Sequence, residues 1–177
     1  NTTEINFTGV PSSTQFEWTN SNDLIGLNES GTGNIQSFTS LNPSNANNQI
    51  AEIVVTPTYS FADLTCYGAT ENASIIVHPT PIIDPLPDVT YCNGSVTQEM
   101  NFPGTANLYS WSNSNTGIGL NESGQQIIYS FSATNTSVST IQSIITVNPY
   151  YEEGVNSCAG TPETFSLYVL PTPNVNS

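Results

Sequence analysis

The sequence predicts an all-β protein made of two tandem modules, each an antiparallel β-sandwich. Three observations predict this class: a motif that occurs twice, short β-prone runs between turn residues, and no helical periodicity. The motif runs over residues 16–31 and returns over residues 109–124, so Trp18 and Trp111 lie 111 − 18 = 93 positions apart. Two copies of a module of about ninety residues account for the 177 residues of the chain.

The repeated motif begins as a strand and ends as a loop. In both copies an aromatic residue and a tryptophan alternate with polar residues, and Asn, Ser and Gly then take over. Alternation with period two predicts a half-buried strand, with its tryptophan pointing into the core. We therefore expect Trp18 and Trp111 to be core residues.

Each module shows the same order of further β-prone runs around this motif. In the first module these runs are residues 1–9, 33–42, 51–59 and 73–78. In the second module they are residues 100–104, 125–135, 143–151 and 164–170. About seven short strands per module, with turn residues between them, predict a two-sheet sandwich of the immunoglobulin-like type.

A proline-rich segment separates the modules. Pro79-Thr80-Pro81 returns as Pro171-Thr172-Pro173, at an offset of 171 − 79 = 92 residues. Proline donates no ladder hydrogen bond and favours extended backbone, so residues 79–88 form a short linker or a first strand. We expect modules at residues 1–81 and 82–177, stacked end to end, the first of them truncated at its N-terminus in a piece of a longer chain.

The charge composition excludes two classes of partner. The chain has no Lys or Arg and 14 acidic residues, which gives a net charge of −14. Nucleic acids and anionic lipids are bound through cationic side chains, so neither is expected as a ligand. No apolar run approaches the roughly 20 residues of a membrane helix, so this segment is not expected to insert into a membrane. Stability must come from apolar burial, hydrogen bonds and cross-links.

The three cysteines predict one disulfide. Cys92 and Cys158 lie in the second module, 158 − 92 = 66 residues apart, and a bridge between them is worth roughly 4 kcal/mol in the chain-entropy model. Cys66 corresponds to Cys158, and we expect its partner upstream of residue 1. Paired cysteines indicate an oxidising, extracytoplasmic setting. The alternative is a pair of buried free thiols.

Catalytic residues are not found in a usable pattern. His78 is the one side chain that titrates near neutral pH, and Leu170 takes its place in the other module. No Ser/His/Asp or Cys/His set recurs, the cysteines lack metal-ligand spacing, and the glycine-containing loop has no lysine for a phosphate. We therefore predict that the protein is not an enzyme and has no catalytic or cofactor-binding residues.

Calcium is the one metal ion that the acidic residues suggest as a ligand. Asp84 and Asp88 lie in the linker, where hard oxygen ligands between tandem β domains can stiffen a rod. Their spacing matches no compact calcium loop, so solvated carboxylates are the preferred interpretation and no cofactor is assigned.

Aromatic residues flank the hairpins that carry Cys66 and Cys158. They are Tyr59 and Phe61 in the first module, and Tyr150 and Tyr151 in the second. Exposed rings could stack on sugars, but the preferred interpretation is that they cover the end of each sandwich.

An ordered set of motifs gives the chain a family resemblance. The motifs are Cys92-Asn93-Gly94, Tyr109-Ser110-Trp111-Ser112-Asn113, Ile118-Gly119-Leu120-Asn121-Glu122-Ser123-Gly124, Ser157-Cys158-Ala159-Gly160-Thr161-Pro162 and Leu170-Pro171-Thr172-Pro173. Together they resemble the PKD-like repeats of SprB-type gliding-motility adhesins. Ordinary PKD domains carry a Trp-Asp-x-Gly-Asp-Gly run that this chain lacks, so the resemblance is to the PKD-like branch.

The resemblance implies a long cell-surface filament rather than a globular enzyme. Such adhesins are exported by the type IX secretion system, are moved along the cell by the gliding machinery, and grip polysaccharide or abiotic surfaces. Their repeats act as tension-bearing spacers, and no catalytic residue is implied at any position here. Two alternatives stay open: a passive surface stalk, and a carbohydrate-binding accessory module of a secreted enzyme.

Overall fold

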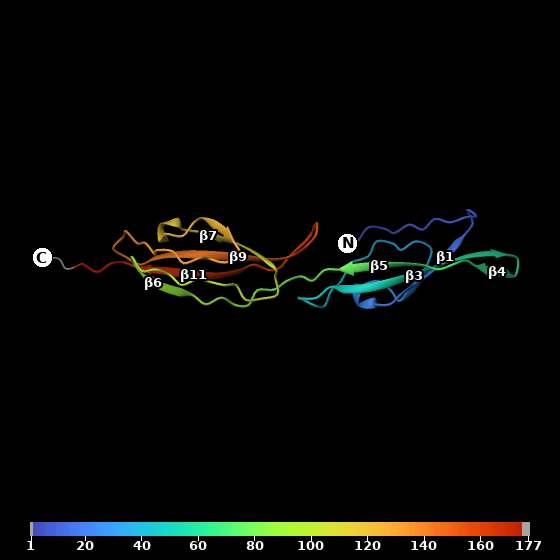
Figure 1. The fold of residues 1–177 in the computed structure, drawn as a ribbon, viewed down its shortest axis with the longest axis horizontal. Helices are drawn as coiled ribbons and strands as arrows, with labels where there is room; N and C mark the ends of the chain where they lie inside the picture. Colours follow the sequence, from blue (N-terminus) through green and yellow to red (C-terminus); the bar gives the residue numbers. More distant parts are fainter. Residues whose placement is uncertain (1, 175–177) are drawn as a thin grey trace. The chain divides into compact units, whose positions relative to one another are not determined.

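The computed structural model describes residues 2–174 and divides the chain into two compact units. Unit 1 is Asn1–Pro79 and unit 2 is Thr80–Ser177, so the division falls two residues before the boundary expected from the sequence. The described residues form strands, loops and two short 3-10 turns (Figure 1). The predicted all-β class is confirmed in both units.

Unit 1 contains one antiparallel sheet of five strands among its described residues. The strands are β1 (Gln15–Asn20), β2 (Ser30–Thr32), β3 (Gln49–Phe61), β4 (Leu64–Tyr67) and β5 (Glu71–Val77). The long strand β3 is central: β1 pairs along one of its edges, and β4 and β5 share the other. The second edge of β5 pairs with no strand that the structure describes.

Unit 2 repeats this sheet and adds one strand. Its strands are β6 (Val89–Cys92), β7 (Leu108–Asn113), β8 (Ser123–Gln125), β9 (Ile141–Glu153), β10 (Asn156–Ala159) and β11 (Glu163–Leu170). Their order is β6-β11-β9-β7-β8, with β10 also paired to β9. Figure 1 labels β6, β11, β9 and β7 of this sheet. The β6–β11 pairing is parallel and the others are antiparallel, so this sheet is mixed.

Four of the expected runs are extended segments and not strands. Beyond Gln125 at the end of β8, these segments are joined to neighbours by isolated bridges, such as Ile5↔Ile35 and Met100↔Ile128, and by single backbone hydrogen bonds. They are residues 2–9, 33–42, 100–104 and 126–135. Residue 1 lies outside the described residues. Side chains interrupt the ladders, because Asn34 Oδ1 accepts a hydrogen bond from the Phe7 amide at 3.0 Å, which a strand neighbour would otherwise take. The expectation of about seven strands per module is therefore wrong.

Each hydrophobic core lies between the sheet and these extended segments. In unit 2 the sheet supplies Trp111, Val147 and Leu167, and the segments supply Phe102 and Ile128. In unit 1 the core is built around Trp18, Ile35 and Val55. Both tryptophans are buried, as expected.

The loop half of the repeated motif forms a 3-10 turn that places one isoleucine in the core. In unit 2 this turn is η2 (Thr116–Ile118); the side chain of Asn115 caps its start, and Gly119 ends it at φ 92°. Ile118 is fully buried. Gly119 adopts the left-handed conformation that glycine tolerates without strain. Unit 1 has the same arrangement in η1 (Asp23–Ile25), between Asn22 and Gly26.

Candidate functional site

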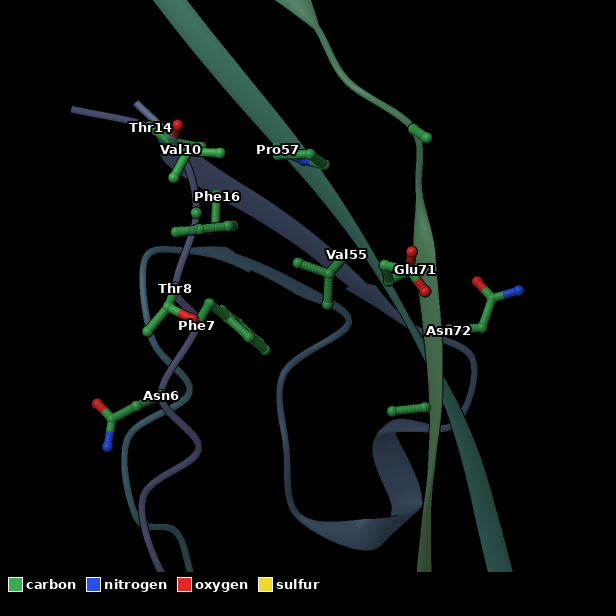
Figure 2. Close-up of a pocket in the computed structure, with 13 residues that line it drawn as sticks. Asn6, Phe7, Thr8, Val10, Thr14, Phe16, Val55, Pro57, Glu71 and Asn72 are labelled. Atoms are coloured by element: carbon green, nitrogen blue, oxygen red, sulfur yellow. The ribbon is translucent and has the colours of Figure 1, made fainter. Parts of the chain in front are cut away.

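An apolar groove of about 430 Å³ lies beside β5 in unit 1 (Figure 2). We call it the β5 groove. Its wall comes from the segment before β1, from β1 and β3, and from the start of β5. Its apolar lining includes Phe7, Val10, Phe16, Val55, Pro57 and Ala73. Glu71 and Asn72 lie on β5 at its rim (Figure 2).

Two aromatic rings form one side of the groove. The ring centroids of Phe7 and Phe16 are 5.6 Å apart at an interplanar angle of 48°. Unit 2 has the same pair as Phe102 and Tyr109, at 5.7 Å and 54°. The pair is buried in unit 2 and only half-buried in unit 1. Something covers these rings in unit 2 that unit 1 lacks.

The cover in unit 2 is the segment that leads into β6 and β6 itself. Ile83, Leu86 and Val89 pack against the unit 2 core. The segment first pairs with the turn after Phe102, where the Asp84 amide donates to the Pro103 carbonyl at 2.9 Å. It then becomes β6, parallel to β11. Residues 82–92 therefore cover part of the surface of unit 2 that corresponds to the β5 groove, and a smaller pocket of about 270 Å³ remains there, lined by Leu86, Phe102 and Phe165 among others.

The inward-facing side chains of the last strand are also more deeply buried in unit 2 than in unit 1. Leu167 and Val169 of β11 are 0% exposed. Their counterparts in β5, Ile75 and Val77, are half-buried. Ala73 is exposed where unit 2 has the buried Phe165. The inner face of β5 is therefore apolar and incompletely covered.

The calcium candidates Asp84 and Asp88 belong to this covering segment. Asp88 Oδ1 accepts a hydrogen bond from the Ser166 amide at 2.7 Å, so this carboxylate ties β11 to the residue before β6. Within residues 2–174, no group of three or more His, Cys, Asp or Glu side chains is placed to hold a metal ion.

The expected Cys92–Cys158 disulfide is wrong. Cys92, Cys158 and Cys66 are all free thiols. Cys92 pairs with Leu170, which lies just past the Val169↔Ile141 pair at the start of β9, whereas Cys158 pairs with Tyr151 near its end. Ten strand residues span about 33 Å, and a disulfide needs Cα atoms within about 7 Å. The oxidising location inferred from a bridge loses that support.

The β3–β4 hairpin carries a second apolar feature of unit 1. Phe61, Leu64 and Tyr67 are 76%, 71% and 68% exposed. The expectation that Phe61 covers the end of the module is therefore wrong. In unit 2 the expectation fits better, because Tyr150 and Tyr151 are half-buried and the Tyr151 hydroxyl donates to Glu153 at 3.0 Å.

Two titratable groups have distinct surroundings. His78 is half-buried, with Nδ1 3.1 Å from Asn48 Oδ1. Burial raises the pKa of Tyr109 above its ordinary value of 10.0; a backbone hydrogen bond with Ala106 lowers it, and the nearby charge of Asp84 raises it further.

Sequence reasoning missed two structural pairs that the repeat contains. Asn20 and Asn113 are buried and bind loop carbonyls through their side-chain amides. Gly124 lies against the indole of Trp111, where any Cβ would collide with the ring. The signal was present, because both residue types recur at the same distance from each tryptophan.

Family models, curated proteins and solved structures gave no match. No helix among the described residues is long and apolar enough to cross a membrane.

Proposed function

We propose that this chain is a repeat segment of a large bacterial cell-surface adhesin filament that mediates substratum adhesion in gliding motility. Its two units are immunoglobulin-like, PKD-like modules that act as tension-bearing spacers. The full-length protein contacts a polysaccharide or abiotic surface and is handled by the gliding and type IX secretion machinery. The protein is extracellular, at the bacterial cell surface.

The parallel pairing of β6 and β11 carries this proposal. Val89 to Cys92 lie beside Leu167 to Leu170, so the first and last strands of unit 2 are neighbours that run in the same direction. Tension that pulls the chain apart before β6 and after β11 draws these strands in opposite directions along their length. All hydrogen bonds between them are then loaded together, whereas a hairpin pulled at its open end breaks its bonds one by one.

Composition gives further support. The chain has no cationic side chain and a net charge of −14, so a filament of such units repels itself and the anionic cell envelope. A spacer needs no catalytic set, and this chain presents a surface rich in Asn, Ser and Thr. The resemblance of the motif order to PKD-like adhesin repeats supplies the specific role.

Single-molecule force spectroscopy on the whole chain, tethered at its two ends, tests the spacer role. We expect unit 2 to unfold at a clearly higher force than unit 1, because the β6–β11 pairing has no counterpart among the described residues of unit 1. Its release frees 170 − 89 + 1 = 82 residues, a gain of roughly 270–300 Å in contour length. If both units open at the same low force, unit 2 has no mechanical clamp and the proposal fails.

A labelled antibody fragment against the two units tests the adhesin role on living source cells. We expect the label to travel along the cell, and the fragment to reduce attachment to glass. A fixed label with normal attachment would instead support a passive stalk.

A second candidate function is favoured by the exposed β3–β4 hairpin. Aromatic rings presented to solvent stack on sugar faces, so Phe61 and Tyr67 could make unit 1 a carbohydrate-binding accessory module. Affinity electrophoresis in polysaccharide gels tests this alternative. Retardation that Phe61→Ala abolishes, while Tyr151→Ala leaves it unchanged, would favour it.

A further inference from the structure

We propose that unit 1 is an acceptor for an extended peptide strand. The strand lies parallel to β5, fills the β5 groove with apolar side chains, and has the sequence character of residues 82–93. This is β-strand addition to an open sheet edge. It is independent of the adhesin role.

The sheet of unit 1 already has an edge on which such a strand can pair. β3 and β5 pair in the register Val55↔Glu71, and β9 and β11 pair in the equivalent register Val147↔Glu163. In unit 2 the other edge of β11 is taken by β6. In unit 1 the other edge of β5 meets no strand among the described residues.

The backbone groups on the open edge can be assigned by analogy. The Ser166 amide donates to Asp88, and the Leu170 carbonyl accepts from the Asn93 amide at 2.9 Å, so alternate residues of β11 face β6. Tyr168 lies between them in this set. The counterpart of Tyr168 in β5 is Ile76, at an offset of 168 − 76 = 92 residues. The amide and carbonyl of Ile76 therefore point toward the open edge.

Apolar side chains in the β5 groove and farther along β5 are incompletely buried. Ile75 and Val77 on β5 and the Phe7–Phe16 pair are each half-buried. In unit 2 the equivalent surface is covered by Ile83, Leu86 and Val89. A segment that carries Ile, Leu and Val at these spacings therefore matches the apolar character of the groove.

The occupant is a segment of this type rather than a second copy of β5. Two β5 edges paired with each other would leave both grooves empty, because β5 brings no counterpart of Leu86. Two chains of net charge −14 also repel each other. The prolines at 85 and 87 hold the approach to β6 extended. In a bound segment of this type, the residue equivalent to Asp88 would accept from the amide of Ser74, the counterpart of Ser166 at an offset of 166 − 74 = 92 residues.

A synthetic peptide of residues 81–94, with Cys92→Ser and a fluorophore, tests the proposal on the whole chain. We expect saturable one-to-one binding by fluorescence anisotropy. Hydrogen exchange should slow in β5, at Ser74 and Ile76. Exchange in β11 should not change, because its edge is already occupied, and unit 2 is therefore an internal control.

Two backbone-methylated peptides provide a matched pair. The Asn93 amide donates to β11, so the amide of Tyr91, two residues earlier, faces the same strand and that of Thr90 faces away. Methylation of the Tyr91 nitrogen should weaken binding about tenfold or more, the effect of one lost hydrogen bond and the accompanying clash. Methylation of the Thr90 nitrogen should leave binding unchanged.

The chain offers a second matched pair. Ile76→Pro removes the amide that faces the open edge and keeps the pairing of β5 with β3, since proline is tolerated on an edge strand. It should abolish peptide binding, whereas Ile76→Thr, which keeps the amide, should retain it. The hydrogen-exchange pattern of β3 reports whether either variant disturbs the fold.

Three outcomes would overturn the proposal. The first is no saturable binding of the unmodified peptide. The second is equal affinity of the two methylated peptides, which would indicate sticking without strand pairing. The third is protection of β5 that rises with chain concentration in the absence of peptide, which would identify a second copy as the occupant.

Discussion

One buried asparagine in each unit, Asn20 or Asn113, joins the loop of the repeated motif to the sheet. In unit 2 the Asn113 amide donates to the Leu120 carbonyl at 2.9 Å and to the Asn121 carbonyl at 3.1 Å, and its oxygen accepts from the Asn115 amide at 3.1 Å. The Ser143 hydroxyl also donates to it. One side chain thus satisfies several backbone groups that have no strand partner.

We expect Asn113→Ala to destabilise unit 2 by about 2–3 kcal/mol, because it leaves buried carbonyls and an amide unpaired. Urea unfolding combined with hydrogen exchange measures this for each unit. Asn20→Ala should do the same in unit 1 only, since Asn20 donates to the Leu27 carbonyl at 2.9 Å. A loss below about 0.5 kcal/mol, the range of ordinary surface substitutions, would contradict the structural role.

Tyr109 makes unit 2 sensitive to alkaline pH. Its pKa is raised in the folded state, chiefly by burial, so the neutral phenol is favoured by folding. The associated stability is present below the unfolded pKa of about 10 and is lost as pH rises through the folded pKa. Unit 1 has Phe16 at the corresponding position, and therefore lacks this group.

We expect Tyr109→Phe to remove this alkaline loss from unit 2 and leave unit 1 unchanged. Chemical unfolding between about pH 8 and pH 11 measures the effect, with wild type and variant compared at each pH. Parallel curves for the two proteins over this range would show that Tyr109 does not govern the loss.

Among the elements, one long central strand organises the sheet of each unit. The two units differ at their last strands, β5 and β11, because only β11 has a further described strand on its outer edge. β3 and β9 each contain 13 residues and pair with strands along both edges. β11 is completed by β6, and β5 is not completed by any described strand. The Asp88–Ser166 hydrogen bond extends the β6–β11 contact by one more attachment.

We expect Asp88→Ala to lower the stability of unit 2 by about 1 kcal/mol, because the Ser166 amide loses its acceptor. Asp88→Asn keeps an acceptor oxygen and should have a smaller effect. Urea midpoints and unfolding forces measure both variants. If calcium at constant ionic strength stabilises wild type but not Asp88→Ala, the carboxylate is a metal ligand and not a backbone cap.

At the scale of the whole molecule, the chain holds itself together without cross-links or basic side chains. Its three cysteines are free, and it has no Lys or Arg. Apolar burial and hydrogen bonds therefore work against the mutual repulsion of 14 acidic residues.

We expect the melting temperature to be the same with and without reductant, and thiol titration of the unfolded protein to find three thiols. The reason is that the register of β9 keeps Cys92 and Cys158 about 33 Å apart. Fewer thiols in non-reduced protein, together with a lower melting temperature after reduction, would restore the disulfide.

Local pattern predicted much of the fold. The strand expected at 51–59 is β3, two residues longer at each end, and the strand expected at 164–170 is β11, longer by one. These predictions succeeded because alternation of apolar residues reflects one buried face, a property of neighbouring residues. The runs at 33–42 and 125–135 failed because Asn, Ser and Thr side chains compete for the backbone there.

The sequence by itself determined the two-unit repeat, the all-β class and the burial of Trp18 and Trp111. Only the tertiary structure decided the parallel β6–β11 pairing, the separation of the cysteines and the open edge of β5. The physical reason is that these features join residues far apart in the chain, such as Val89 and Leu167. Which strands meet, and in which register, is set by packing of the whole core, and no local run of residues encodes it.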